Sequence, residues 1–251
     1  FEQLPLTKKA REKHFKLEKK VLENSDAVLV IGKTMKTKFD AFSKNVKVVT
    51  NGYDSDLNTE IEKLDSKFTI THVGLMNADR NPISFWQAIS ELSNENKEFA
   101  NDISVKIVGK VGEEVKDSIQ KYAIQNINFE GYLSHDEVRK FQQKSQVLLL
   151  AVNNVKSAKG IITGKIFEYL QAKRPILAIG PQDGDLAEII HKTKSGEIVD
   201  FNQVSELKDV IWSMYQLYKK GRLVSKSVDI EKYHRKELTK ELVNIIKETI
   251  S

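Results

Sequence analysis

Short apolar segments alternate with longer segments of helical character from Lys67 onward. The apolar segments lack the strict polar alternation of a half-solvated strand, so they predict strands that are buried on both faces. The predicted strands are 68–73, 103–108, 127–130, 146–151, 175–179 and 197–199, and the predicted helices between them are 82–92, 113–123, 135–143, 164–172 and 185–191. This order predicts an α/β fold in which helices cover both faces of a parallel sheet.

A smaller unit of the same kind precedes this alternation. Residues 5–24 and 34–42 predict helices, and the apolar runs 26–31 and 46–49 predict buried strands. Asn51-Gly52 is a turn signal after the second strand, and the polar stretch 53–66 predicts a linker and a domain boundary. Two helices with apolar stripes close the chain. The stripes consist of Val204, Leu207, Val210, Ile211, Met214, Leu217 and Tyr218, and of Leu238, Leu242, Ile245 and Ile246.

Composition excludes several classes of protein. The chain has no cysteine, which excludes disulfides, thiolate catalysis and zinc sites built on cysteine. No apolar run approaches the ~20 residues that a membrane-spanning helix needs, and we expect no signal peptide and a cytoplasmic protein. The chain begins at Phe1 within a helical pattern, and we expect it to be a fragment of a longer protein.

Positive charge is concentrated near the beginning of the chain. The formal net charge is +5, and seven basic residues lie at positions 8–20 with only two glutamates among them. A basic helix of this kind either binds anionic lipid, as a peripheral membrane contact, or forms a solvated face, and the sequence leaves both interpretations open. Nucleic-acid binding is not expected, because no series of aromatic side chains accompanies the charges to stack on bases.

Lys165 and Glu168 lie three residues apart on an otherwise apolar helix, which places them on one face and one turn apart. The loop before this helix contains Gly160 and Gly164, and the first turn of the helix offers free backbone N–H groups. A cation, a carboxylate and the positive end of a helix together suit a ligand that carries phosphate and hydroxyl groups. The alternative is a partly solvated ion pair on a core helix.

The loop after strand 68–73 predicts a second part of the same site, because ligands of an open parallel sheet bind beyond the carboxyl ends of its strands. Gly74 lets the backbone approach a ligand closely. Asn81 is expected to be the N-cap and Pro82 the first residue of the following helix, with Arg80 beside its positive end. This arrangement favours an anion site. The alternative is an ordinary capped helix with an exposed arginine.

Other motifs are incomplete. Lys110 stands where a dinucleotide-binding domain carries an acidic residue, and no Gly-x-Gly-x-x-Gly opens the domain, so a nicotinamide enzyme is not expected. Ile166 replaces the serine or threonine of a P-loop. Two Asp-x-Asp sequences, at 54–56 and 183–185, match a manganese-binding pattern, but a linker and a helix N-cap are the simpler interpretations. No histidine has metal-ligand spacing with another, so no metal site is predicted, and His72 is interpreted as structural.

The order and spacing of these segments resemble the retaining, two-domain glycosyltransferases of the GT-B fold, in particular family 4 (group 1). The segments that carry the resemblance are 23–31, 46–54, 71–80, 105–109, 129–132, 147–151 and 164–180. The resemblance implies a Rossmann-like donor-binding domain at 67–228. It also implies that residues 1–58 contain the C-terminal remnant of a second Rossmann-like domain, on the acceptor side, together with the hinge. A C-terminal helix at 229–251 would pack back on that first domain.

Roles for single residues follow from the resemblance. Arg80 and Lys165 would bind the donor diphosphate and offset charge on the departing nucleotide, as the catalytic residues, without a metal or other cofactor. Glu168 would accept hydrogen bonds from the ribose hydroxyls. The remaining donor-binding residues would flank the base (Tyr132 and Leu133), lie near the donor sugar and phosphates (Gly160 and Ile161), or open the site (Gly74).

Three departures from the family pattern affect these expectations. Gly160 stands where the family has the first of two glutamates, which contacts the donor sugar, and Asn81 replaces a lysine after Arg80. Only the tail of the acceptor domain is recognisable, so we expect this chain to bind donor with little or no turnover by itself.

The resemblance implies a glycosyltransferase that moves a sugar from a UDP- or GDP-sugar to a sugar, lipid-linked or other acceptor, with retention, in bacterial surface glycan biosynthesis. Its location would be cytoplasmic, peripheral on the inner membrane face. Two alternatives stay open: a non-catalytic module that binds nucleotide sugars, and a UDP-sugar epimerase of the same fold.

Overall fold

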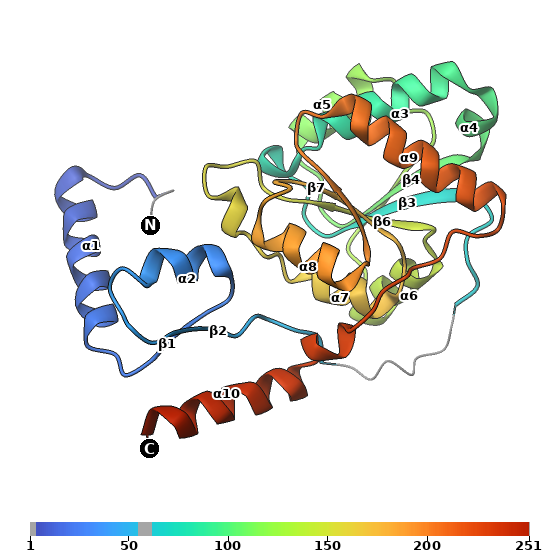
Figure 1. The fold of residues 1–251 in the computed structure, drawn as a ribbon. Coiled ribbons are helices and arrows are strands. Elements are labelled where there is room, and N and C mark those ends of the chain that lie inside the picture. Colours follow the sequence, from blue (N-terminus) through green and yellow to red (C-terminus); the bar gives the residue numbers. More distant parts are fainter. Residues whose placement is uncertain (1–3, 55–61, 251) are drawn as a thin grey trace.

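The computed structural model describes residues 4–54 and 62–250 of the chain. Its larger part is a six-stranded parallel sheet in the order β5-β4-β3-β6-β7-β8 (Figure 1). The strands are β3 (Phe68–Val73), β4 (Ile103–Val108), β5 (Ile127–Glu130), β6 (Val147–Ala151), β7 (Ile176–Ile179) and β8 (Gly196–Val199). Three of them have the predicted bounds and the others begin one residue away, so the predicted α/β fold is confirmed.

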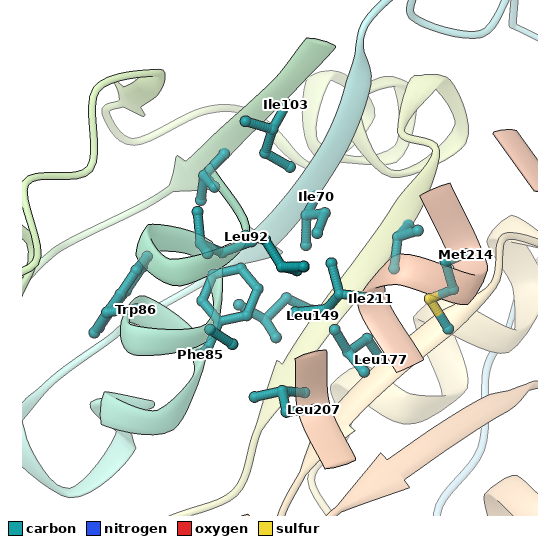
Figure 2. Close-up of a cluster of buried hydrophobic side chains, with 14 of the residues drawn as sticks. Ile70, Phe85, Trp86, Leu92, Ile103, Leu149, Leu177, Leu207, Ile211 and Met214 are labelled. Carbon is teal, nitrogen blue, oxygen red and sulfur yellow. The ribbon is translucent and has the colours of Figure 1, made fainter. Parts of the chain in front are cut away.

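Helices cover both faces of this sheet, as predicted. One layer contains α3 (Ile83–Glu95), α4 (Lys97–Asp102), α5 (Glu113–Lys121) and α9 (Val204–Lys219), and the other contains α6 (His135–Lys144), α7 (Lys165–Ala172) and α8 (Asp185–Thr193). Alternate residues of a strand enter opposite cores, because side-chain direction reverses at each residue. Leu149 lies in the cluster beneath α3 and α9 that Figure 2 shows, whereas Leu148 and Leu150 lie in the cluster beneath α7 and α8. None of the helices in the described parts of the chain is both long and apolar enough to cross a membrane.

Helix α4 is an element that the sequence patterns did not predict. Asn96 interrupts the helical backbone after α3 with an extended conformation, and its side chain accepts a hydrogen bond from the backbone N–H of Phe99 at 2.9 Å. This is an N-cap, so a second helix begins at once and buries Phe99. The predicted helix 82–92 therefore extends to Glu95 and is followed by another.

The smaller unit is a parallel pair of strands with two helices. It contains α1 (Lys8–Glu23), β1 (Val28–Val30), α2 (Lys33–Phe39) and β2 (Val46–Val48). The prediction that β1 is buried on both faces is wrong, because Val30 is buried but Leu29, on the opposite face, is 46% exposed. Among the described residues this sheet has two strands, and they leave that face uncovered.

Helix α10 (Arg235–Ile250) lies beside the smaller unit (Figure 1). It follows the 3₁₀ helix η3 (Ile230–Tyr233). The backbone N–H of Tyr53 donates to the carbonyl of Tyr233 at 3.1 Å, and the N–H of Arg235 donates to the carbonyl of Tyr53 at 2.9 Å. These hydrogen bonds hold the beginning of α10 against the end of the smaller unit.

Asn51 and Gly52 form no turn, contrary to prediction, but belong to the extended segment that meets α10. A Cβ at Gly52 would collide with the backbone carbonyl oxygen of Tyr233, so the glycine allows η3 and the beginning of α10 to approach. Tyr53 is buried, so the predicted linker does not begin there. Residues 55–61 of that linker lie outside the described residues, and the domain boundaries 1–58, 67–228 and 229–251 stay predictions.

Asp185 joins the two units. The stretch 183–185 does contain the N-cap of α8, but the N-cap residue is Gly184 and no aspartate side chain caps this helix. The carboxylate instead accepts hydrogen bonds from the backbone N–H and the hydroxyl of Thr34, both at 3.1 Å, in the first turn of α2. A carboxylate there stabilises the positive end of α2. Lys33 adds a salt bridge to Glu188 at 2.6 Å.

Lys173 ends α7 in the left-handed region, with φ 52° and ψ 38°, and its side chain is exposed. An L-residue pays for this conformation, whereas glycine adopts it freely. We expect Lys173→Gly to raise the free energy of unfolding by about 1 kcal/mol in urea denaturation. Lys173→Ala removes the same charge but keeps Cβ, and an equal gain in that variant would contradict the explanation.

Candidate functional site

The centre of the large sheet is the pair β3 and β6, where the strand order reverses. The chain continues from β3 to β4 on one side and from β6 to β7 on the other. Between β3 and β6 two pairs of residues are in register, Ile70 with Val147 and Thr71 with Leu148. β3 and β4, in contrast, pair over all six residues of β3. Such a switch point leaves a crevice at the carboxyl ends of the two strands.

Two buried side chains bridge β3 and β6 beyond their last paired residues. The Tyr169 hydroxyl accepts a hydrogen bond from the backbone N–H of Val73 at 3.0 Å and donates to the carbonyl of Leu149 at 3.3 Å. His72 Nδ1 lies 3.1 Å from the same carbonyl. Burial raises the pKa of Tyr169, so it keeps its proton for this bond. These contacts give the interpretation of His72 as a structural residue a physical basis.

Lys165 begins α7 and its side chain lies over Gly74. A Cβ at Gly74 would lie 2.6 Å from Lys165 Nζ, and Gly74 has a φ of +109°, which L side chains rarely adopt. The positive φ requires glycine at this position, and the lack of a side chain leaves room for the end of the lysine. The sequence predicted that Gly74 lets a ligand approach the backbone, and in the structure the group that approaches it is the lysine.

Arg80 is at the end of η1 (Ala78–Arg80) and is anchored across the switch point. Its Nε donates to Oδ1 of Asn153 at 2.6 Å, and its Nη1 lies 3.5 Å from the carbonyl of Leu75. The backbone N–H of Asn154 also donates to the carbonyl of Asp79 at 2.7 Å. The loops after β3 and β6 are therefore tied together, and they hold the guanidinium at the carboxyl ends of these strands.

The helix beside Arg80 does not begin as predicted. Pro82 occupies the N-cap position of α3, and Asn81 lies one residue before it. The Asn81 amide is used elsewhere, because it accepts from Trp86 Nε1 at 2.8 Å and donates to the hydroxyl of Ser118 at 2.7 Å. It therefore joins α3 to α5 rather than capping α3, and the anion site that the sequence analysis placed beside this helix start stays a prediction.

Glu168 lies one turn after Lys165, as the spacing predicted. Its Oε2 accepts a hydrogen bond from Nε2 of Gln142 at 3.1 Å, and Gln142 is only 2% exposed. Gln142 and Asn153 are therefore the residues that contact the predicted site and that the sequence analysis missed. No motif marked them, because each lies in a different loop or helix from its partner.

The electrostatics of Lys165 show that the predicted charges converge. Burial, and then the charge of Arg80, lower the pKa of Lys165, while the charge of Glu168 opposes this effect. Within residues 4–54 and 62–250, neither Lys165 nor Arg80 forms a salt bridge. Two neighbouring, half-buried cations that form no salt bridge in the described parts of the chain favour the binding of an anion.

The other predicted donor-binding residues lie around this centre. Tyr132 and Leu133 follow β5, two strands away from β3 along the same carboxyl edge, and Tyr132 is 97% exposed. Gly160 and Ile161 are at the end of η2 (Ala158–Gly160) in the connection from β6 to α7. A Cβ at Gly160 would lie 3.3 Å from Cγ2 of Thr34, so this loop faces the smaller unit. Their roles toward a ligand stay predictions.

Carboxylates of the two Asp-x-Asp sequences have other partners. Asp54 forms a salt bridge with Arg235 at 3.1 Å, and Asp183 forms one with Lys159. Asp185 binds Thr34, and Asp56 lies outside the described residues. Across the ranges that the structure describes, no three His, Asp or Glu side chains are grouped as metal ligands. These partners favour the structural interpretation of Asp54, Asp183 and Asp185.

Comparison with known proteins identifies a family and a fold. The family described as glycosyl transferases group 1 matches residues 67–216, more than half of the chain. No curated protein sequence matches the chain.

Solved structures share the fold at low sequence identity. Sucrose-phosphate synthase from Thermosynechococcus elongatus is 14% identical with a TM-score of 0.71, and the match covers 99% of this chain and 64% of that one. HepE from Anabaena, in complex with UDP and glucose, is 11% identical with a TM-score of 0.72, and the match covers 94% of this chain and 67% of that one. The lipopolysaccharide outer core galactosyltransferase WaaB is 14% identical with a TM-score of 0.65, and the match covers 89% of this chain and 62% of that one. This chain thus spans about two thirds of the length of each.

The pKa of His72 predicts how stability changes with pH. Burial, followed by the charge of Lys165, lowers this pKa from 6.5 to about 4. The unfolded chain therefore binds a proton between these pH values that the folded chain does not bind. As the pH falls from 6.5 to 4, we expect the free energy of unfolding to fall by about 3 kcal/mol through this residue.

The control is His72→Asn, which can still donate to the Leu149 carbonyl but does not titrate. Urea denaturation of both proteins at pH 7 and pH 4 gives the difference in their pH dependence. An equal loss of stability in both proteins would show that His72 is not the group responsible.

Proposed function

The chain belongs to the glycosyltransferase group 1 family, and we propose that it binds a nucleotide-diphosphate sugar in the crevice between β3 and β6. The protein would transfer the sugar of this donor to an acceptor. The observation that carries the proposal is that Lys165 and Arg80, two half-buried cations without salt-bridge partners in the described chain, lie together at that crevice. The carboxylate of Glu168 is one turn away.

The proposed chemistry is electrostatic. When the bond between sugar and diphosphate breaks, negative charge develops on the departing phosphate oxygen. Fixed cations at Lys165 and Arg80 stabilise that charge more than they stabilise the bound donor, and this lowers the barrier. Glu168 accepts hydrogen bonds from ribose hydroxyls and so orients the nucleotide. Because the two side chains supply the positive charge, we propose that the reaction needs no metal and no other cofactor.

The identity of the donor is proposed by analogy. The HepE structure contains UDP and glucose, which supports a UDP-sugar ahead of a GDP-sugar as the donor. In this proposal Tyr132 and Leu133 flank the base, and Gly160 and Ile161 lie near the sugar. Transfer with retention of anomeric configuration is part of the same proposal.

A role in bacterial surface glycan synthesis is a further part of the proposal. WaaB, a lipopolysaccharide outer core galactosyltransferase, supports it through the shared fold. The acceptor would then be a sugar or a lipid-linked sugar. Helix α1 presents Lys9, Lys13, Lys16 and Lys20 on one exposed side, and this stripe would meet an anionic cytoplasmic membrane surface.

A non-catalytic module that binds nucleotide sugars is the second candidate. Gly160, at the position of an expected glutamate, offers no carboxylate to the donor sugar, and the methyl group of Thr34 lies close to the space a side chain would fill. Both candidates bind a nucleotide sugar, and only the transferase moves the sugar to an acceptor. Sugar transfer by a longer form of the protein would exclude the second.

We predict that isothermal titration will detect UDP binding by the chain, and that Lys165→Ala will weaken it by about tenfold to a hundredfold, the value of a charge-assisted hydrogen bond. Lys159→Ala is the matched control, because Asp183 already pairs with that lysine. EDTA should leave the affinity unchanged. Equal losses in both lysine variants, or affinity that needs a divalent metal, would contradict the proposed site.

A further inference from the structure

We propose that Gln142 is a positioning residue that holds the carboxylate of Glu168 ready for the ribose of the donor. The inference rests on the proposed function of the crevice and extends it to a residue on another helix. Its basis is the hydrogen bond from Gln142 Nε2 to Glu168 Oε2 at 3.1 Å, which joins α6 to α7.

The position of Gln142 is one where packing alone favours an apolar residue. Val138, four residues earlier on the same face of α6, packs against the hydrophobic cluster, and so does the preceding residue, Phe141. Gln142 is buried like a core residue, and burying an amide costs free energy unless the amide is hydrogen-bonded. The residue thus places a hydrogen-bond donor where leucine or methionine would fill the space without that cost, and the acceptor it meets is Glu168.

The contact leaves one carboxylate oxygen of Glu168 available to a ligand. A carboxylate has two oxygens, and Gln142 holds Oε2, so Oε1 accepts no hydrogen bond from the described parts of the chain. The backbone of α7 is fixed separately, because the next residue, Tyr169, bonds to both β3 and β6. Gln142 therefore fixes the side-chain orientation of Glu168 rather than the place of its helix.

Fixing this side chain before the ligand binds lowers the entropy cost of binding. Holding one flexible side chain in its bound conformation gains roughly threefold to tenfold in affinity. The gain depends on Glu168, so it should disappear when Glu168 is removed. A purely structural role for Gln142 predicts instead a loss that is independent of Glu168.

The test is a double-mutant cycle with UDP as the probe and isothermal titration as the readout. Gln142→Met keeps the length of the side chain and removes the donor. We expect it to weaken UDP binding about fivefold in the unmodified chain and not at all in a Glu168→Ala background. Gln143→Met, the same substitution one position along α6, is the matched control and should leave UDP affinity unchanged in both backgrounds.

A second variant serves if Gln142→Met does not fold. Gln142→Glu keeps the volume but places two carboxyl groups together, and these cannot both ionise easily. We expect its UDP affinity to be about tenfold below that of the unmodified chain at pH 8, and to recover toward pH 5.5 as a shared proton restores a donor.

The outcomes separate this inference from the proposed function. If the unmodified chain binds no UDP, both are overturned. If it binds UDP and Gln142→Met binds equally well, or loses the same affinity with and without Glu168, the positioning role alone is overturned. An affinity of Gln142→Glu that does not change between pH 8 and pH 5.5 also contradicts it.

Discussion

The structure depends on the divergence of two neighbouring parallel strands. β3 and β6 pair over two residues, and this is the place where the strand order reverses and the chain leaves the two strands in opposite directions across the sheet. A hydroxyl from α7 and an imidazole from β3 supply hydrogen bonds where the ladder stops. Arg80 and Lys165 bring positive charge to the carboxyl ends of these two strands, so the place where the sheet is interrupted is also the place of the candidate site.

Much of the large domain could be predicted from the sequence, because parallel strands buried on both faces leave continuous apolar runs such as 147–151. Arg80 could be predicted as a candidate because it follows a buried strand, and Lys165 and Glu168 because they stand three residues apart on an otherwise apolar helix. The contacts that support these side chains could not be predicted from the sequence. Asn81 and Asn96 look alike as N-caps, yet Asn96 caps a helix while Asn81 bonds to Trp86 and Ser118, a choice that only the packing of α3 on α5 decides.

Other polar motifs show the same limit of sequence patterns. A pair of aspartates around Gly184 matches a metal-binding pattern, but the structure uses Asp185 to cap α2 and pairs Asp183 with Lys159. Likewise Asn51-Gly52 has the composition of a turn and serves as the place where α10 approaches the backbone. In each case the partner comes from more than twenty residues away in the sequence, and local spacing carries no information about it.

A crystal structure of the chain with UDP bound tests the central claim most directly. The account predicts the diphosphate at the carboxyl ends of β3 and β6, with phosphate oxygens about 3 Å from Lys165 Nζ and from the Arg80 guanidinium. The ribose should lie against the oxygen of Glu168 that Gln142 does not hold. A nucleotide bound elsewhere, or a diphosphate in this crevice that contacts neither cation, would contradict it.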